Sequence, residues 1–312
     1  MTPAARLAEW LDVRPNEIRL VVLAFAGAFL MMAFVVLSRA LREAFFLEIF
    51  DASSLPYVGG AAIALGLAAA TIFSRAVSVR HPQSVMRVTI AGLAVAILAM
   101  HPFLDDDGTL IVAFYLLTAV GTLLLTSGFW LVVSELFAVR EAKRLFGLVS
   151  AGGTLGLLAA GLSMRPLLGQ FQPRDLLYVL AGLLGLALVV NEAFPRDRLG
   201  RTATGREPVS PTTFGQGLRL IGSTSQVRLI AIIFLLVGAA SAIVDFQFKE
   251  AVQASLGRGP DMAVFFGDFY AWTGGLALLV QILLTTRLLA LSLIHISEPT
   301  RPRLVSRIPS SA

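Results

Sequence analysis

Eight long apolar runs constrain this chain more than any other feature of its sequence. They cover roughly residues 20–40, 55–74, 86–104, 109–134, 145–165, 176–194, 229–248 and 263–286. An α-helix of about 20 mostly apolar residues spans the hydrocarbon core of a bilayer. The sequence therefore predicts an all-α, polytopic membrane protein, folded as a helical bundle with about eight transmembrane helices.

The composition supports this prediction and excludes other classes of protein. Of the 312 residues, 56% are hydrophobic and only 14% are charged, whereas a soluble domain carries about 25% charged residues. Disorder, an ordinary cytosolic enzyme and a nucleic-acid-binding arm are therefore excluded. The chain has no cysteine, and before residue 291 its histidines are His81 and His101. Because thiol nucleophiles and thiolate ligands need cysteine, we expect no enzymatic activity, no cofactor and no metal site.

The basic residues predict the orientation of the chain. Lysine and arginine outnumber aspartate and glutamate by 25 to 20, and membrane proteins concentrate basic residues in their cytoplasmic loops. Along the predicted spans, 16 basic residues fall on the side of the N-terminus and six on the opposite side. We therefore interpret the net charge of +5 as a topology signal. It predicts a cytoplasmic N-terminus and no nucleic-acid partner.

The longest polar stretch divides the predicted spans into two sets. Residues 195–228 contain three prolines and six arginines, and they predict a basic cytoplasmic linker. A six-helix bundle (1–194) precedes this linker, and the first two helices of a second bundle (229–290) follow it. This is the plan of the major facilitator superfamily, in which two six-helix bundles enclose a central site. On that plan twelve helices are expected, of which about eight are present.

The last residues, 291–312, predict a non-native tail. The stretch SLIHISEPTRP resembles the translated read-through of a sequencing adapter, and it follows directly on an unfinished apolar helix. We therefore expect the second bundle to be truncated near Ala290, with a C-terminal part lost. A genuine polar cytoplasmic tail is the alternative.

Charged residues inside the predicted spans are the first candidates for a binding site. They are Arg39, Arg42, Glu43, Asp245 and Lys249. A charge inside the bilayer costs on the order of 3 kcal/mol, so it is normally paired or faces water. The first three share one helical face, the last two have the i,i+4 spacing of an ion pair, and the apolar FFLEIF after Glu43 predicts a helix that continues to about residue 50. The functional interpretation is a cavity with cations for an anionic substrate, and the alternative is anchoring at the membrane surface.

Spans 1, 7 and 8 carry two further signals. Leu41-Arg42-Glu43-Ala44 in span 1 is echoed by Phe248-Lys249-Glu250-Ala251 in span 7, as an internal repeat of two bundles requires. In span 8, the aromatic run FFGDFYAW surrounds Asp268. We interpret these aromatic residues either as stacking partners for the ring of a substrate or as an aromatic belt at the membrane surface.

A last group of candidates lies around the connection between spans 4 and 5. Glu135 ends span 4, a tight cluster of cations follows, and glycines open span 5 to close helix packing. The cations are Arg140, Lys143 and Arg144, and the glycines are Gly152, Gly153 and Gly156. A phosphate-binding loop would need a preceding strand and a G-K-[ST] ending. Neither is present, so we interpret the connection as a gating motif.

The stretch FWLVVSELFAVREAKRLFGLVSAGGTLGLLAAG, residues 129–161, resembles the nucleotide (ATP/ADP) translocase family of bacteria and plastids, a branch of the major facilitator architecture. RALREAFFL at 39–47 and VDFQFKEAV at 244–252 are similar to the charged motifs of that family on its spans 1 and 7. The resemblance implies substrate binding by Arg42, Glu135 and Asp245, and a bacterial inner membrane as the location. The sequence departs from the family where Arg42 replaces lysine, Asp245 replaces glutamate and Ser134 replaces asparagine.

The leading functional hypothesis is a secondary transporter, an antiporter-like carrier of nucleotides or other organic phosphates that works by alternating access. Its expected partners are a small anionic substrate, such as ATP or ADP, and the lipid bilayer. Arg39, Arg42 and Lys249 are the cations expected to hold the phosphate groups. Two alternatives stay open: a major facilitator exporter of other small molecules, and a non-transporting membrane sensor or scaffold.

Overall fold

A computed structural model describes residues 14–15, 17–104, 108–195, 219, 222–257 and 261–296, and for residue 139 and residues 281–296 it describes the backbone alone. In chain order the elements are α2 (Ile18–Ile49), η1 (Ala52–Ser54), α3 (Leu55–Val79), α4 (Pro82–Met100), η2 (His101–Phe103), α5 (Gly108–Leu136), α6 (Val139–Leu168), η3 (Pro173–Asp175), α7 (Leu176–Ala193), α9 (Ser225–Leu256) and α10 (Asp261–Ile296). Every described element is a helix.

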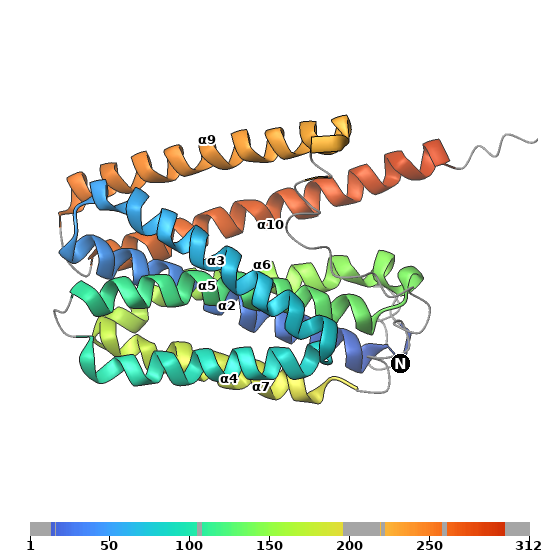
Figure 1. The fold of residues 1–312 in the computed structure, drawn as a ribbon. Coiled ribbons are helices and arrows are strands. Elements are labelled where there is room, and N and C mark those ends of the chain that lie inside the picture. The colour runs from blue at the N-terminus through green and yellow to red at the C-terminus, as the bar shows by residue number, and fades with distance from the viewer. Residues whose placement is uncertain are drawn as a thin grey trace, which may run out of the picture.

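The prediction of an all-α, polytopic membrane bundle is confirmed. Eight helices in the described part of the chain are long and apolar enough to cross a membrane, and each of the eight predicted spans coincides with one of them. Figure 1 shows long helices that run roughly side by side. Short connections join them through α7, so that neighbours along the chain run in opposite directions.

Helix α2 forms the centre of the bundle. It packs against α5, α6, α7 and α10, and residues on several of its faces are buried, among them Leu20, Phe34 and Leu41. A helix that is apolar all round is stable only when protein or lipid covers all of its sides. The part of α2 before Arg39 is such a helix, because its only polar side chain from residue 20 onward is that of Ser38.

Glycines let α6 approach α2 at backbone contact. A Cβ atom on Gly152 would lie 2.5 Å from the carbonyl oxygen of Phe25, and a Cβ atom on Gly156 would meet the backbone of Phe29. Because both glycines and both phenylalanines are four residues apart, they lie on facing stripes of the two helices. The predicted close packing of small residues is confirmed here, and it fixes α6 against α2.

Helix α2 continues past its charged residues, as predicted. It ends at Ile49, and Phe50 closes it with its N–H donated to the carbonyl oxygen of Phe46 at 2.8 Å. Its 32 residues correspond to about 48 Å, whereas the hydrocarbon core measures about 30 Å. Arg39 and Glu43 therefore lie within the last three turns of a helix longer than the membrane is thick.

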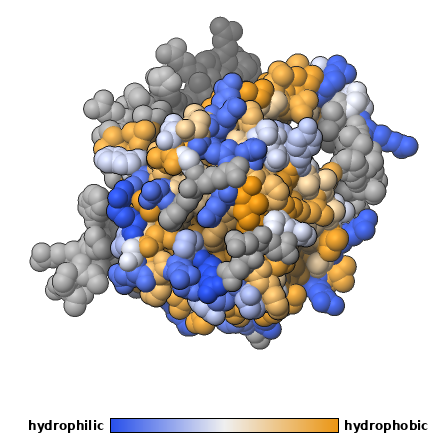
Figure 2. Space-filling model, turned by 90° about the vertical axis from the view of Figure 1, so that its left-hand side faces the viewer, coloured by the Kyte–Doolittle hydropathy of each residue, from blue (hydrophilic) through white to orange (hydrophobic). Residues whose placement is uncertain are grey.

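Helix α9 lies at the outer edge of the bundle (Figure 1). Only Lys249 and Val252 of this helix are buried, and apolar residues such as Ile233 and Phe234 are exposed. An exposed apolar surface of this kind suits a helix that meets lipid. Figure 2 shows the end of the bundle where α2 leads into α3 and α9 into α10, with hydrophilic residues spread among hydrophobic ones.

Two predicted segments fall largely outside the described residues. Of the linker expected over 195–228, the structure describes residues 195, 219 and 222–228, and the last four begin α9. Of the tail expected over 291–312, it describes the backbone of 291–296, which ends α10. The boundaries of the two bundles and the nature of the tail stay predictions.

Candidate functional site

Helices α2 and α9 meet through three pairs of residues, and successive pairs are about one helical turn apart. The contacts join Arg39 Nη2 to Asp245 Oδ1 (3.0 Å), Lys249 Nζ to Glu43 Oε1 (3.0 Å) and Gln253 Nε2 to the carbonyl oxygen of Leu47 (2.8 Å). Each pair joins residues 206 positions apart. Since residues four apart share a helical face, one stripe of α2 matches one stripe of α9.

Glu43 is the centre of this contact. Its side chain is fully buried, and it accepts hydrogen bonds from Arg39 Nε at 3.0 Å and from the hydroxyl of Tyr270 at 2.9 Å. Lys249 Nζ lies 3.0 Å from the same carboxylate. A buried charge is tolerated only when opposite charges and hydrogen bonds compensate for its lost water. Glu43 therefore ties together α2, α9 and α10.

Asp245 has a different environment from Glu43. Its carboxylate lies between two cations, with Oδ1 at 3.0 Å from Arg39 Nη2 and Oδ2 at 2.6 Å from Lys249 Nζ. The side chain is 41% exposed, whereas that of Glu43 is 0% exposed. The predicted pairs Arg39–Glu43 and Asp245–Lys249 thus both form, and the structure joins them into one network.

Arg42 supplies a cation without a carboxylate partner among the described residues. Its Nε and Nη1 atoms are buried and have no hydrogen-bond partner there, and its guanidinium lies over the ring of Tyr115 on α5, 5.1 Å from the ring centre. A cation–π contact compensates only part of a lost hydration shell. The contact region therefore holds three cations and two carboxylates, and Arg42 is the cation in excess.

Tyr270 is the residue of the predicted aromatic run that joins this site. Its hydroxyl bonds to Glu43, and Arg39 lies over its ring at 5.2 Å from the centre. The other members of the run behave differently: Asp268 pairs with Arg165 on α6, and Trp272 is 81% exposed. Within the run, stacking near the cations is thus restricted to Tyr270.

Glu135 lies far from the other predicted substrate residues. It follows Tyr115 by 20 residues on the same helix, which corresponds to about 30 Å along the axis of α5. Arg42, which contacts Tyr115, and Asp245 are therefore at one end of the bundle and Glu135 is at the other. The geometry does not bring these three predicted residues together.

The predicted gating motif lies at the same end as Glu135. Arg144 Nη2 donates to both carboxylate oxygens of Glu17 at 2.8 and 2.6 Å, and Glu17 is buried. This ion pair ties the start of α6 to the start of α2. Arg140 and Lys143 are exposed. A role of this motif in gating stays a prediction.

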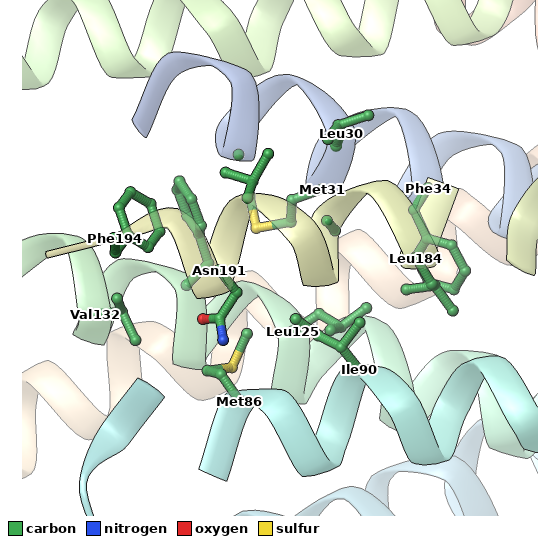
Figure 3. Close-up of a pocket in the computed structure, with 14 residues that line it drawn as sticks. Leu30, Met31, Phe34, Met86, Ile90, Leu125, Val132, Leu184, Asn191 and Phe194 are labelled. Atoms are coloured by element: carbon green, nitrogen blue, oxygen red, sulfur yellow. The ribbon is translucent and has the colours of Figure 1, made fainter. Parts of the chain in front are cut away.

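A separate cavity lies between α2, α4, α5 and α7 (Figure 3). Apolar side chains such as Met31, Phe34 and Leu184 line it, and its one polar side chain is that of Asn191. That amide donates to the carbonyl oxygen of Gln83 at 3.2 Å. Since no cation is among its described lining residues, it does not suit an anionic substrate. The described residues also hold no group of three His, Cys, Asp or Glu side chains that suits a metal ion.

Two residues of the site are absent from the sequence-based candidates. Gln253 follows Lys249 by one helical turn, so the i,i+4 pattern that joins Asp245 to Lys249 extends to it and is a usable signal. Tyr115 has no such signal. Its contact with Arg42 depends on how α5 packs against α2, and one sequence does not determine that packing.

Comparison with known proteins gives a distant similarity to nucleotide carriers. The chain is 21% identical to the ADP,ATP carrier protein 1 of Chlamydia trachomatis over 189 residues, a match that covers 54% of this chain and 36% of the carrier. It is also 21% identical to the ADP,ATP carrier protein 1 of Chlamydia muridarum over 190 residues, with the same coverage. The match thus spans about a third of each carrier. No family model and no solved structure matches the chain.

Proposed function

We propose that this protein is a membrane transporter that binds a nucleotide or another organic phosphate and exchanges it across the membrane. The observation that carries this proposal is the excess cation Arg42 at the α2–α9 contact, whose Nε and Nη1 atoms are buried and lack a hydrogen-bond partner among the described residues. Phosphate groups bind arginine through paired, charge-assisted hydrogen bonds. A substrate phosphate therefore supplies the acceptors that the buried nitrogens of Arg42 lack.

The cost of the site also supports a function rather than a structural role. A cation with buried nitrogens that lack hydrogen-bond partners is unfavourable by several kcal/mol. Apolar packing would stabilise α2 better at that position if binding were not required. The distant similarity to ADP,ATP carriers points to the same substrate class, since those relatives are nucleotide carriers by name.

The two kinds of helix contact suit alternating access, in which one bundle moves against the other around the site. The contact of α2 with α6 is made at backbone distance by glycines. The contact of α2 with α9 is made by long polar side chains. Polar contacts can break and re-form without exposing apolar surface, so the α2–α9 contact can open while α6 stays fixed to α2.

The membrane, the orientation and the helix plan of the chain are part of the same proposal. We place the chain in a bacterial inner membrane with a cytoplasmic N-terminus, on the twelve-helix plan of the major facilitator superfamily. The distribution of basic residues supports the orientation, and the chlamydial relatives support a bacterial membrane. Under this orientation the α2–α9 contact lies toward the outer face of the membrane.

Nucleotide exchange in liposomes tests the proposal. Liposomes that contain the full-length protein are loaded with unlabelled ATP, and the uptake of labelled ADP is measured. We expect uptake that depends on the internal ATP, that falls at least tenfold with Arg42→Ala, and that is unchanged with Arg75→Ala, which removes an exposed cation of α3. No uptake of any nucleotide by correctly inserted protein would overturn the proposal. Transport of another molecule that is insensitive to Arg42→Ala would favour an exporter.

A further inference from the structure

Asp245 lies between two of the three cations of the site that the proposed function assigns to an anionic substrate. Its two oxygens contact Arg39 Nη2 at 3.0 Å and Lys249 Nζ at 2.6 Å. A carboxylate and a phosphate both offer a pair of oxygens to such cations. Two of the three cations at the α2–α9 contact are therefore already bound to an anion that belongs to the chain.

We propose that Asp245 is a displaceable internal counter-ion. ADP or ATP enters the site when one of its phosphate groups takes the place of the Asp245 carboxylate between Arg39 and Lys249. This inference rests on the proposed function. While no substrate is bound, the Asp245 carboxylate compensates Arg39 and Lys249.

Exposure distinguishes the carboxylate that leaves from the one that stays. Asp245 is 41% exposed, so a change of side-chain rotamer can keep its charge in contact with water. Glu43 is fully buried and is held by donors on α2, α9 and α10. Its removal would take the buried anion away from Arg39 and Lys249, and breaking a buried ion pair is far more costly. Glu43 therefore remains in place when substrate binds.

Displacement also changes the contact between the helices. The Arg39–Asp245 ion pair joins α2 to α9, and a phosphate bound to both Arg39 and Lys249 replaces this link by one that lasts only while the substrate is bound. The Lys249–Glu43 and Gln253–Leu47 contacts remain. A nucleotide has two or three phosphate groups, and a second one can bind Arg42. Substrate binding thus makes one of the three links between α2 and α9 depend on the substrate.

Equilibrium binding of ADP to the purified protein tests the inference. A site that is open for about a tenth of the time binds its ligand about tenfold more weakly than a site that is always open. We expect Asp245→Asn to lower the Kd for ADP about tenfold. Glu250→Gln is the matched control, because it removes the same charge from an exposed position on α9, and we expect it to leave the Kd unchanged.

A chemical variant tests the same point on one folded protein. The chain has no cysteine, so Asp245→Cys introduces a single thiol. Modification with the anionic sulfonatoethyl methanethiosulfonate restores a negative charge there, whereas methyl methanethiosulfonate adds none. We expect the anionic product to bind ADP about tenfold more weakly than the neutral one.

The outcomes separate this inference from the proposed function. The inference is wrong if the wild-type protein binds ADP and Asp245→Asn binds it no more tightly than the wild type does. It is also wrong if the neutral cysteine product binds ADP no more tightly than the anionic product does. Asp245 is then a ligand of the substrate or a bystander. If the wild-type protein binds neither ADP nor inorganic phosphate, the proposed function fails and the inference fails with it.

Discussion

At the scale of single residues, the site depends on how each carboxylate is compensated. The i,i+4 spacing predicts the pairs within α2 and within α9, because both partners lie on one helix. The same spacing does not predict that Lys249 reaches Glu43 or that Tyr270 bonds to it, because those contacts cross between helices. The internal repeat aligns Lys249 with Arg42 and Glu250 with Glu43. The structure instead buries Glu43 and exposes Glu250, so two residues that the repeat aligns differ in their burial.

Glu43 is the residue whose loss we expect to cost most stability. Glu43→Gln leaves Arg39 and Lys249 without their buried anion, and breaking a buried pair in this way costs about 3–5 kcal/mol. Unfolding in detergent micelles by titration with a denaturing detergent measures the loss. Glu48→Gln, at an exposed position on the same helix, is the control and is expected to change stability by less than about 0.5 kcal/mol.

A compensating variant sharpens this prediction. Glu43→Gln combined with Lys249→Met removes a charge of each sign, so it is expected to recover part of the stability that Glu43→Gln loses. The ion-pair interpretation is wrong if Glu43→Gln is as mild as Glu48→Gln, or if the double variant is as unstable as the sum of its single changes.

At the scale of helices, hydropathy predicts where each one lies but not which neighbours it contacts. Apolar runs give the eight spans because length and composition suffice for a membrane helix. Their partners depend on local shape, for which glycines are the readable signal. Gly152 and Gly156 indicate a close neighbour for α6, and the structure identifies it as α2. Glu135 lies far from Arg42 because α2 and α5 run in opposite directions, and the alternation of the predicted spans already implies this separation.

The α2–α6 contact is expected to fail when its glycines gain a side chain. Gly156→Ala places a Cβ atom against the backbone of Phe29, which cannot rotate away, and overpacking of this kind costs about 1–3 kcal/mol. Unfolding in detergent micelles by titration with a denaturing detergent measures this loss of stability. Gly147→Ala on the same helix is the control, because its Cβ atom meets open space and alanine favours a helix by up to about 1 kcal/mol. Equal effects of the two changes would contradict the assigned packing.

The α2–α9 contact is expected to loosen without Gln253. Its amide donates to the carbonyl oxygens of Leu47 and Phe50 and accepts from the N–H of Ala52, and each bond contributes about 0.5–1.5 kcal/mol. Gln253→Ala is therefore expected to shift the population toward longer distances between the ends of α2 and α9.

Spin labels can measure this distance because the chain has no cysteine of its own. Glu48→Cys on α2 and Ser255→Cys on α9 are exposed attachment sites. Gln247→Ala, at an exposed position of α9, serves as the control and is expected to leave the distance distribution unchanged. A Gln253→Ala distribution that matches this control would show that Gln253 does not hold the helices together.

At the scale of the whole molecule, the basic residues predict an orientation that labelling can check. The α2–α3 and α5–α6 connections lie at opposite ends of the bundle (Figure 1). With a cytoplasmic N-terminus, Ser53→Cys faces outward and Ala138→Cys faces the cytoplasm. We expect a membrane-impermeant thiol reagent to label Ser53→Cys in intact cells and Ala138→Cys only after permeabilisation. The reverse labelling pattern would show that the N-terminus lies outside the cytoplasm, and it would contradict the predicted orientation.

The central claim is that the cations at the α2–α9 contact bind the phosphate groups of a substrate. Equilibrium binding of ADP and of adenosine, which has no phosphate, tests it most directly. We expect ADP to bind the wild-type protein, adenosine to bind at least about tenfold more weakly, and Arg42→Ala to lose at least about tenfold in affinity for ADP, since a charged hydrogen bond contributes about 1.5–3 kcal/mol. Arg75→Ala should bind ADP as the wild type does. Equal binding of adenosine and ADP, or an Arg42→Ala protein with unchanged affinity for ADP, would contradict the claim.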